Sequence, residues 1–546
     1  MKRIVMTVVA AVVAAGVVTA QEDAASITQR IEVTRQYVPE LGGAQKLDFA
    51  PRMIDTVTLK PDIRYSITPT PWKSVFDTKP IAPVAISAAE YRSQRPFYLA
   101  LGGGYPLRSM LDFYAAFPTA RDVRAGVYVN HAGQWAKLEN DRGKREYAPW
   151  TENNVGVYAG RDFGSRSLDF DLHYGYNYYG TLGEGPVGNA PMERVAYHKT
   201  VASLTFGDRF TDLTRFNYRF GMTGSLWGRR SLGNPSTSAF ADFGWKAGRG
   251  AFLVGASFRG AWSFRGQSDW YVGLVPEYRL QTGRFSLRAG AKAYYERRRF
   301  PEAEGEGHFY VLPTLGLSYR VADAFIPYVH VDGEIATGDY LALSALNPYI
   351  TEDADIVGSR RAEVRGGFRG DAGGVVTYDV YVGHMTGELP FFLKTGDVFL
   401  PQSAPVNLFF AGAGVGLELP MGFGLQAGVR YDSYNTSSNF WNGQGGRIGM
   451  GIPEFTVTGR VGYRYRERFS VGIGMELLGE RRFASVEQLD ATVPATVNLR
   501  VDMEYKTGER FSIFAVGDNL LNRRIYRYLG YPALGTNVLA GVRMLF

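Results

Sequence analysis

From Pro96 onward, apolar and polar residues alternate along the chain with a period of two. Between positions 285 and 295, apolar residues occupy the odd positions, and Arg288 and Lys292 lie among the residues between them. The same alternation recurs at 423–431, 455–465 and 497–505. Successive side chains of a β-strand point to opposite faces, so the pattern predicts strands with one apolar and one polar face.

The predicted strands are long, and the connections between them alternate in length. They run for about 10–13 residues, longer than the ~5–6 of soluble sheets and close to the ~9–11 that cross a bilayer at a tilt. Short turns such as 281–283 and 466–468 alternate with long connections such as 336–360 and 386–405. Outer-membrane barrels have short periplasmic turns and longer extracellular loops. We therefore predict an all-β fold, a transmembrane antiparallel β-barrel of about 22 strands over residues 96–546.

The last predicted strand carries a further indication of an outer-membrane protein. In the terminal stretch NVLAGVRMLF, one face consists of Val538, Ala540, Val542, Met544 and Phe546. A terminal aromatic residue on the lipid-facing side is similar to the C-terminal signal of proteins that are inserted into the outer membrane. We expect this face to act as the insertion signal, with outer-membrane lipid as its partner and the outer membrane of a Gram-negative bacterium as the location.

The N-terminal residues 1–20 have the features of a secretory signal peptide. Lys2 and Arg3 precede an apolar run, and Val18-Thr19-Ala20 offers a small-residue cleavage site. The alternative is an uncleaved helical anchor, but the run is shorter than the ~20 residues that a membrane-spanning helix needs. Gln21 then follows instead of a Cys, so we expect no lipid anchor.

Residues 21–95 differ from the rest of the chain because they are rich in proline. These are Pro39, Pro51, Pro61, Pro69, Pro71, Pro80 and Pro83. Proline cannot donate to a sheet ladder, which argues against a central strand here. We expect a periplasmic or lumen-threading extension, docked through apolar residues such as Trp72 and Phe76; a disordered segment is the alternative.

Composition excludes several classes of function. The chain has no Cys, which excludes disulfides, thiolate metal sites and Cys nucleophiles. Without the two cations of the signal peptide, the charge surplus is small for 546 residues and gives no support to a nucleic-acid partner. High Gly, Tyr and Phe contents favour strands over helices.

Candidate chemical sites are sparse. None of the six His has metal-ligand spacing to another, and the acidic runs 302–306 and 352–355 lack the spacing of a dedicated calcium loop. There is no nucleophile elbow and no phosphate-binding loop. We therefore expect no metal, no cofactor and no enzyme. A Ser/His/Asp site assembled only by the fold is the least favoured alternative that one sequence leaves open.

Six cationic residues occupy the polar face of predicted strands and are expected to face the lumen. They are Arg288, Lys292, Arg430, Arg460, Arg464 and Arg500. Such residues select anions, hold a plug through ion pairs, or simply hydrate the wall. We favour hydration of the wall.

The stretch before the last strand contains Asn519, Leu520, Asn522, Tyr526, Gly530, Tyr531, Pro532 and Gly535. Through these residues it resembles the C-terminal region of TonB-dependent outer-membrane receptors. The resemblance implies a barrel of 22 strands and an N-terminal plug domain. Residues 21–95 are too few and too proline-rich for that plug, so the chain resembles a plug-less relative. Ile31-Glu32-Val33-Thr34 is similar to the energy-coupling box of these receptors, which makes TonB a candidate partner.

A barrel this wide needs something to obstruct its lumen. The candidates are the extension 21–95, inward-folded connections such as 336–360 and 386–405, or another outer-membrane, surface or periplasmic protein. The connection 386–405 contains LPFFLKTGDVFLP, whose apolar residues indicate partner contact or self-packing equally. The favoured function is solute or nutrient uptake, or a gated pore. The alternatives are a structural or accessory subunit of an outer-membrane complex and, least favoured, a surface enzyme.

Overall fold

The structure is a computed structural model that describes residues 96–117, 122–140, 143–182, 194–230, 232–263, 266–300, 304–351, 358–436 and 447–546. The signal peptide 1–20, the extension 21–95 and the coupling-box segment 31–34 lie outside the described residues, so they stay predictions.

Twenty-two strands pair into one antiparallel sheet. They are β1 (Phe97–Tyr105), β2 (Arg108–Ala116), β3 (Val123–Gln134), β6 (Trp150–Phe163), β7 (Arg166–Gly180), β8 (Arg194–Asp208), β9 (Asn217–Arg229), β10 (Leu232–Ala247), β11 (Gly250–Trp262), β12 (Ser268–Thr282), β13 (Phe285–Arg299), β14 (Glu306–Tyr319), β15 (Ile326–Ala336), β16 (Ser359–Ala372), β17 (Val376–Thr395), β18 (Val398–Leu419), β19 (Phe423–Thr436), β20 (Phe455–Tyr465), β21 (Phe469–Leu478), β24 (Thr496–Lys506), β25 (Phe511–Asp518) and β28 (Asn537–Leu545).

The connections between the barrel strands contain small secondary-structure elements. Three two-stranded hairpins join β4 (Lys137–Glu139) to β5 (Arg145–Tyr147), β22 (Arg481–Phe483) to β23 (Ala491–Val493), and β26 (Tyr526–Tyr528) to β27 (Tyr531–Pro532). The helix α2 (Tyr340–Leu346) lies between β15 and β16, and a 3₁₀ turn (Pro420–Gly422) joins β18 to β19. Within the described residues, no helix combines the length and apolar character that a bilayer crossing requires.

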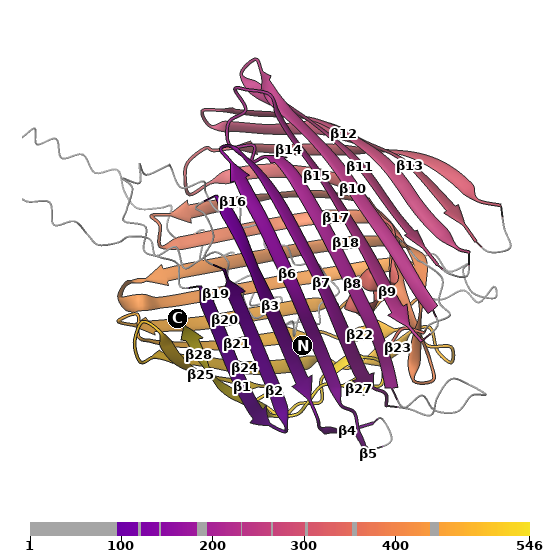
Figure 1. Cartoon of the computed structure of the whole chain (residues 1–546), viewed down its shortest axis with the longest axis vertical. Helices are drawn as coiled ribbons and strands as arrows, with labels where there is room; N and C mark the ends of the chain where they lie inside the picture. Colours follow the sequence, from indigo (N-terminus) through magenta and orange to yellow (C-terminus); the bar gives the residue numbers. More distant parts are fainter. Residues whose placement is uncertain are drawn as a thin grey trace, which may run out of the picture. The chain divides into compact units, whose positions relative to one another are not determined.

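The sheet closes on itself because β1 pairs with both β2 and β28. In Figure 1 the yellow C-terminal strand β28 lies beside the indigo strand β1, and β25 follows on the other side of β28. Just beyond the paired strands, Phe97 and Phe546 exchange two backbone hydrogen bonds of 2.9 and 3.0 Å, and their rings stack at 5.4 Å. A closed ring leaves no sheet edge, which is the condition for a sheet to cross a bilayer. The predicted barrel of 22 strands is confirmed.

The two faces of the strands differ as the alternation predicts. On β7, Leu168, Phe170 and Leu172 are exposed large apolar side chains, and the polar Asp169 and Asp171 alternate with them. Exposed apolar side chains on the outer face are what a barrel presents to lipid, and the polar residues line the inside. The short turns need left-handed backbone at their tips, as at Gly164, whose φ is 66°.

The prediction of a long connection over 386–405 is wrong. β17 continues to Thr395 and β18 begins at Val398, and the two strands pair in register from Glu388↔Pro405 to Thr395↔Val398. Only Gly396 and Asp397 form the turn, and the φ of Gly396 is 61°. The apolar residues of this segment belong to a buried hairpin. The prediction assumed two strands of ordinary length and assigned the residues between them to a loop.

Candidate functional site

The long connections fold over one end of the barrel and pack against one another. We call this layer the lid; it consists of the described residues of 135–149, 337–351, 447–454, 479–495 and 519–536, together with the hairpin tip 388–405. Its apolar side chains form two buried clusters that combine residues of several connections, and a third cluster packs the connection 337–351 against the wall strands. Connections from different parts of the ring of strands therefore pack together at this end of the barrel.

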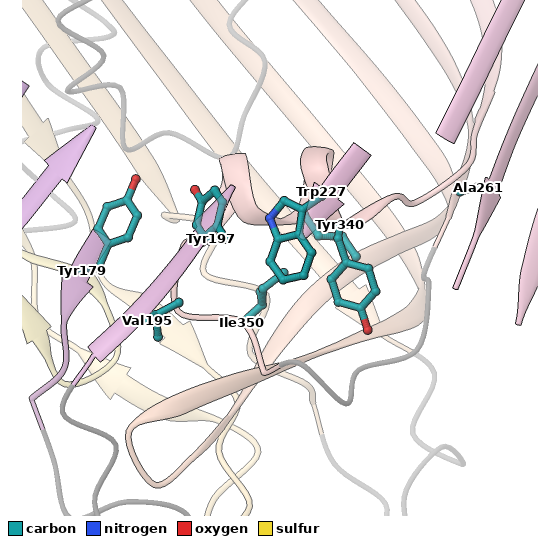
Figure 2. Close-up of a cluster of buried hydrophobic side chains, with 8 residues drawn as sticks. Tyr179, Val195, Tyr197, Trp227, Ala261, Tyr340 and Ile350 are labelled. Atoms are coloured by element: carbon teal, nitrogen blue, oxygen red, sulfur yellow. The ribbon is translucent and has the colours of Figure 1, made fainter. Parts of the chain in front are cut away.

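The helix α2 anchors the lid to the wall formed by β7, β8 and β9. The helix begins at Asp339, whose carboxylate accepts a hydrogen bond of 2.6 Å from the backbone N–H of Ala342. Figure 2 shows Tyr340 against Trp227 of β9, and the two rings stack with centroids 4.9 Å apart. Burial of large apolar side chains of this kind stabilises by roughly 1.5–3 kcal/mol each. The helix is thereby fixed against the wall.

Two hydrogen bonds reinforce this anchor. The guanidinium of Arg229, at the end of β9, donates to the carbonyl oxygen of Ile350 at 2.9 Å. The Asn234 side chain of β10 accepts from the backbone N–H of Tyr340 at 2.8 Å. Arg229, Asn234 and Ile350 are each at most 2% exposed. Buried polar groups that find partners in this way hold the connection 337–351 in one position.

The hairpin tip 388–405 packs inside the lid. Phe391, Leu393, Val398, Phe399 and Ala404 are all buried, and Phe391, Leu393 and Ala404 share a cluster with Ile448 and Ala484. Lys394 exchanges backbone hydrogen bonds of 2.9 and 3.0 Å with Ala484 and Val486. The apolar residues of this segment are therefore accounted for by self-packing.

The receptor-like motif between β25 and β28 forms the base of another lid connection. Asn519 is 1% exposed, and its side-chain amide donates to the carbonyl oxygens of Arg523 and Leu534 at 2.7 and 2.8 Å. Its side-chain oxygen accepts from the N–H of Arg523 at 2.9 Å. The backbone of Asn519 has a φ of 48°, a left-handed conformation that Asn adopts more readily than most residues. One side chain thus closes the connection 519–536 at both of its ends.

The remaining motif residues complete the same connection. Asn522 accepts from the N–H of Thr536 at 3.1 Å, and Gly535 lies so close to its side-chain oxygen that a Cβ would collide with it. Leu520 donates through its backbone to Leu499 at 3.0 Å. Tyr526 pairs with Pro532 across the β26–β27 hairpin, and Gly530 turns it with a φ of 81°. These contacts are structural; no comparison tests a further role for the motif.

Tyr531 is the member of the motif that joins different parts of the lid. Its hydroxyl donates to the carbonyl oxygen of Asp397, in the turn between β17 and β18, and accepts from the N–H of Leu182, beyond β7, at 3.4 Å. Its ring lies 4.0 Å from that of Tyr349 and 5.9 Å from that of Phe399. β7 and β18 stand on opposite sides of the ring of strands, so one residue ties together connections from across the barrel mouth.

Burial governs the protonation of the lid tyrosines. It raises the pKa of Tyr349, Tyr528 and Tyr531 above the ordinary value. The hydroxyls therefore stay protonated at neutral pH. This keeps Tyr531 a donor to Asp397, and Tyr528 a donor to the carbonyl oxygen of Leu346 at 3.0 Å.

Four of the six predicted lumen cations form ion pairs on the wall. Arg288 pairs with Glu277 at 2.5 Å, Lys292 with Asp332 at 2.8 Å, Arg430 with Asp432 at 2.7 Å and Arg460 with Asp502 at 2.8 Å. Arg464 and Arg500 have no acidic side chain within ion-pair distance in the described part of the chain. Their role in selecting a solute stays a prediction.

The predicted insertion-signal residues lie on the closing strand β28 and at the chain end. Val538 and Phe546 are exposed on that strand's outer side. Nothing in the structure tests their recognition during assembly. Among the described residues, no three His, Asp or Glu side chains come together as a metal site requires.

Sequence reasoning missed the partners of the lid. Leu182, Asp397 and Trp227 carry no local pattern that marks them, because their contacts come from distant strands. Tyr531 was found only through the resemblance. A run of apolar residues in an expected loop was the one local indication that a lid exists.

No family model matches the chain, and no curated protein matches it. Solved structures of outer-membrane barrels do match. The FrpB iron transporter from Neisseria meningitidis superposes with a TM-score of 0.65 at 10% identity, over 82% of this chain and 82% of that one. The pyoverdine outer-membrane receptor FpvA from Pseudomonas aeruginosa gives 0.63 at 11% identity, over 83% and 79%. The siderophore receptor PiuA from Acinetobacter baumannii gives 0.60 at 11% identity, over 82% and 81%.

The comparisons confirm the resemblance at the level of the fold. The chain has the closed 22-strand barrel fold of these outer-membrane transporters and receptors. The three neighbours are named as an iron transporter, a pyoverdine receptor and a siderophore receptor. Whether a plug domain is missing lies outside the described residues.

Proposed function

We propose that this protein takes up a solute through its barrel and that the lid is its gate. The single observation that carries the proposal is the lid, in which Tyr531 bonds both Leu182 and Asp397 and so joins connections from opposite sides of the mouth. The fold is that of the FrpB iron transporter and of siderophore receptors, which supports a role in nutrient uptake. Coupling to TonB through residues 31–34 remains part of the proposal.

The lid has contacts that are weak enough to open. Apart from the hairpin tip 388–405, which continues the ladder of β17 and β18, the connections of the lid are joined to one another by side chains and short backbone bridges. Connections of this kind open at lower free-energy cost than the strands that carry them. A gate made of connections therefore moves while the barrel stays closed.

A disulfide tests the gate. Lys394 in the hairpin tip and Ser485 in the connection 479–495 form an isolated parallel bridge, so their Cα atoms lie close enough to consider a disulfide. The chain has no Cys of its own, so Lys394→Cys with Ser485→Cys adds one pair only. We expect low conductance in planar bilayers when the pair is oxidised, and recovery on reduction.

The two single variants are the matched controls, because neither can form the bridge. Equal conductance and equal solute uptake in the oxidised and reduced double variant would contradict the gate. The accessory-subunit alternative makes a different prediction, because it expects a partner protein on the barrel. If the protein is isolated from native membranes only as a free chain, that result would count against the accessory-subunit alternative. It would not bear on the proposed gate.

A further inference from the structure

Three polar side chains from neighbouring strands meet on the outer face of the barrel. They are Ser109 of β2, His131 of β3 and Asn153 of β6. In the strand register, Leu101 pairs with Leu111, Leu111 pairs with His131, and His131 pairs with Asn153. Directly paired residues share a face. The exposed side chains of Leu101 and Val155 show that this is the outer face, and Ser109 has the same parity as Leu111.

The three side chains form a linear relay of hydrogen bonds. The hydroxyl oxygen of Ser109 lies 2.5 Å from Nε2 of His131. On the other side of the ring, Nδ1 of His131 lies 2.7 Å from Oδ1 of Asn153. A hydroxyl, an imidazole and an acceptor in this order form the arrangement in which a serine is activated as a nucleophile.

The direction of the relay follows from the partners of Asn153. Its Nδ2 donates to the carbonyl oxygen of Tyr176 at 3.0 Å and to the hydroxyl of Thr151 at 3.3 Å. Oδ1 is therefore the atom that faces His131, and it accepts a hydrogen bond from the N–H at Nδ1. A neutral imidazole that donates from Nδ1 has a free lone pair on Nε2. Nε2 is thus the acceptor for the Ser109 hydroxyl, which is the tautomer that a general base needs.

Ser109 is open toward lipid on one side. Its register partner on β1 is Gly103, where a Cβ would find no atom nearer than 3.9 Å. On β3 its partner is Gly133, which the ring of Trp135 covers. Tyr105 and Leu107, next to this opening, are 79% and 64% exposed. The space over Gly103, beside Ser109, is therefore open on the outer face.

The relay lies at the end of the strands that carries the long connections. Below it on the outer face, Val127 and Val129 of β3 and Val155 and Val157 of β6 form an apolar band. Long connections are extracellular in outer-membrane barrels, which puts the relay near the outer-leaflet interface. At that depth, the ester bonds of a lipid lie next to Ser109 while its acyl chains lie along the apolar band.

We propose that Ser109, His131 and Asn153 form a hydrolytic site for acyl esters of outer-leaflet lipids. This function is separate from the proposed gate. Ser109 and His131 are the catalytic residues, and Asn153 is a positioning residue that holds the imidazole in the required tautomer. The sequence indicated nothing of this site, because the three residues come from three strands and have no common motif.

The chemistry is that of acyl transfer to water. Oγ of Ser109 attacks the ester carbonyl carbon, and Nε2 of His131 takes its proton. The ester C–O bond breaks, and His131 gives the proton to the leaving alcohol. Water, activated by the same Nε2, then attacks the acyl-serine, so that the fatty acid leaves and Ser109 regains its proton. Water is the only co-reactant.

The first test is covalent labelling of the full chain in outer membranes or mixed micelles with a fluorophosphonate. We expect one adduct. Peptide mapping of the labelled native chain should place it on Ser109, so this step of the test needs no substitution. Ser109→Ala and His131→Ala should abolish labelling. Thr237→Ala removes a hydroxyl from the outer face of β10 and serves as the matched control with unchanged labelling. Heat-modifiable migration in SDS checks that each variant is folded.

The second test measures acyl release from two substrates, a fluorogenic phosphatidylethanolamine and purified lipopolysaccharide, each in mixed micelles. Release from only one of them identifies the source of the ester. Ser109→Ala should lower the rate by about 10³-fold or more. Asn153→Ala should lower kcat with KM unchanged, and Asn153→Asp, which keeps an acceptor at the same place, should restore most of it.

Two outcomes overturn the proposal. One is a folded, unlabelled native chain that releases no fatty acid from either substrate. The other is labelling or release that persists in Ser109→Ala. Conductance of Ser109→Ala should equal that of the native chain, which separates this proposal from the gate.

Discussion

The hydroxyl of Tyr531 donates a hydrogen bond to the carbonyl oxygen of Asp397, although 134 residues separate them in the chain. Tyr531 stands just before the strand that closes the barrel, and Asp397 stands in the turn between β17 and β18. This one contact therefore connects the C-terminal part of the mouth with a turn six strands away around the ring. The lid depends on such contacts between residues that are far apart in the sequence.

Tyr531→Phe should loosen the lid. The ring and its contacts with Tyr349 and Phe399 remain, but the carbonyl of Asp397 and the N–H of Leu182 lose a buried partner. An unsatisfied buried group costs about 1–3 kcal/mol, so the open population should rise roughly 5- to 150-fold. Single-channel recordings measure this rise. Tyr505→Phe, on an exposed side chain of β24, is the control and should behave as the native chain.

Asn519→Ala should destabilise the connection 519–536. The change removes the side-chain hydrogen bonds to Arg523 and Leu534 and places an alanine in a left-handed conformation, for a combined cost of about 3 kcal/mol. Trypsin measures the effect, because Arg523, Arg524 and Arg527 lie in this connection.

Asn519→Gly separates the two causes, because glycine accepts the backbone conformation and lacks the amide. Its cleavage should be intermediate between the native chain and Asn519→Ala. Equal cleavage of all three chains would show that the connection does not depend on this side chain.

Reversing the charges of Arg464 and Arg500 should change ion selectivity. These two cations are exposed or half-buried and have no acidic partner in the described residues, so they add positive potential to the wall. Arg464→Glu with Arg500→Glu should shift the reversal potential in a salt gradient toward cation selectivity. Arg297→Glu, on the outer face of β13, is the control. An unchanged reversal potential would indicate that both cations only hydrate the wall.

Phe546→Ser should reduce the amount of assembled barrel. The ring of Phe546 stacks on Phe97 at the closure between β1 and β28, a contact worth about 1 kcal/mol, and it is also the end of the predicted insertion signal. The heat-modifiable fraction in isolated outer membranes measures assembly. Leu545→Ser alters the neighbouring position, which faces the other side of the strand, and should have a smaller effect. A comparable loss in both variants would argue against a specific signal.

The alternation of residues determined the wall of this protein. Whether a side chain such as Leu287 or Arg288 points outward or inward depends only on its position within its own strand, so the pattern can be read from adjacent residues. The same locality explains why the strand count agreed with the structure. It also explains the error at 386–405, where β17 and β18 continue beyond the wall and are longer than the strand length that the prediction assumed.

Tertiary structure alone decided the lid and the relay on the outer face. Tyr531 meets Leu182 and Asp397 only because the ring closes and brings the ends of distant strands to one mouth. Ser109, His131 and Asn153 meet only because the register between three strands sets them side by side. A period of two says which face a residue occupies, but it does not say which residue of the next strand lies beside it. The register between strands determines which side chains meet, and the proposed lid contacts and relay depend on it.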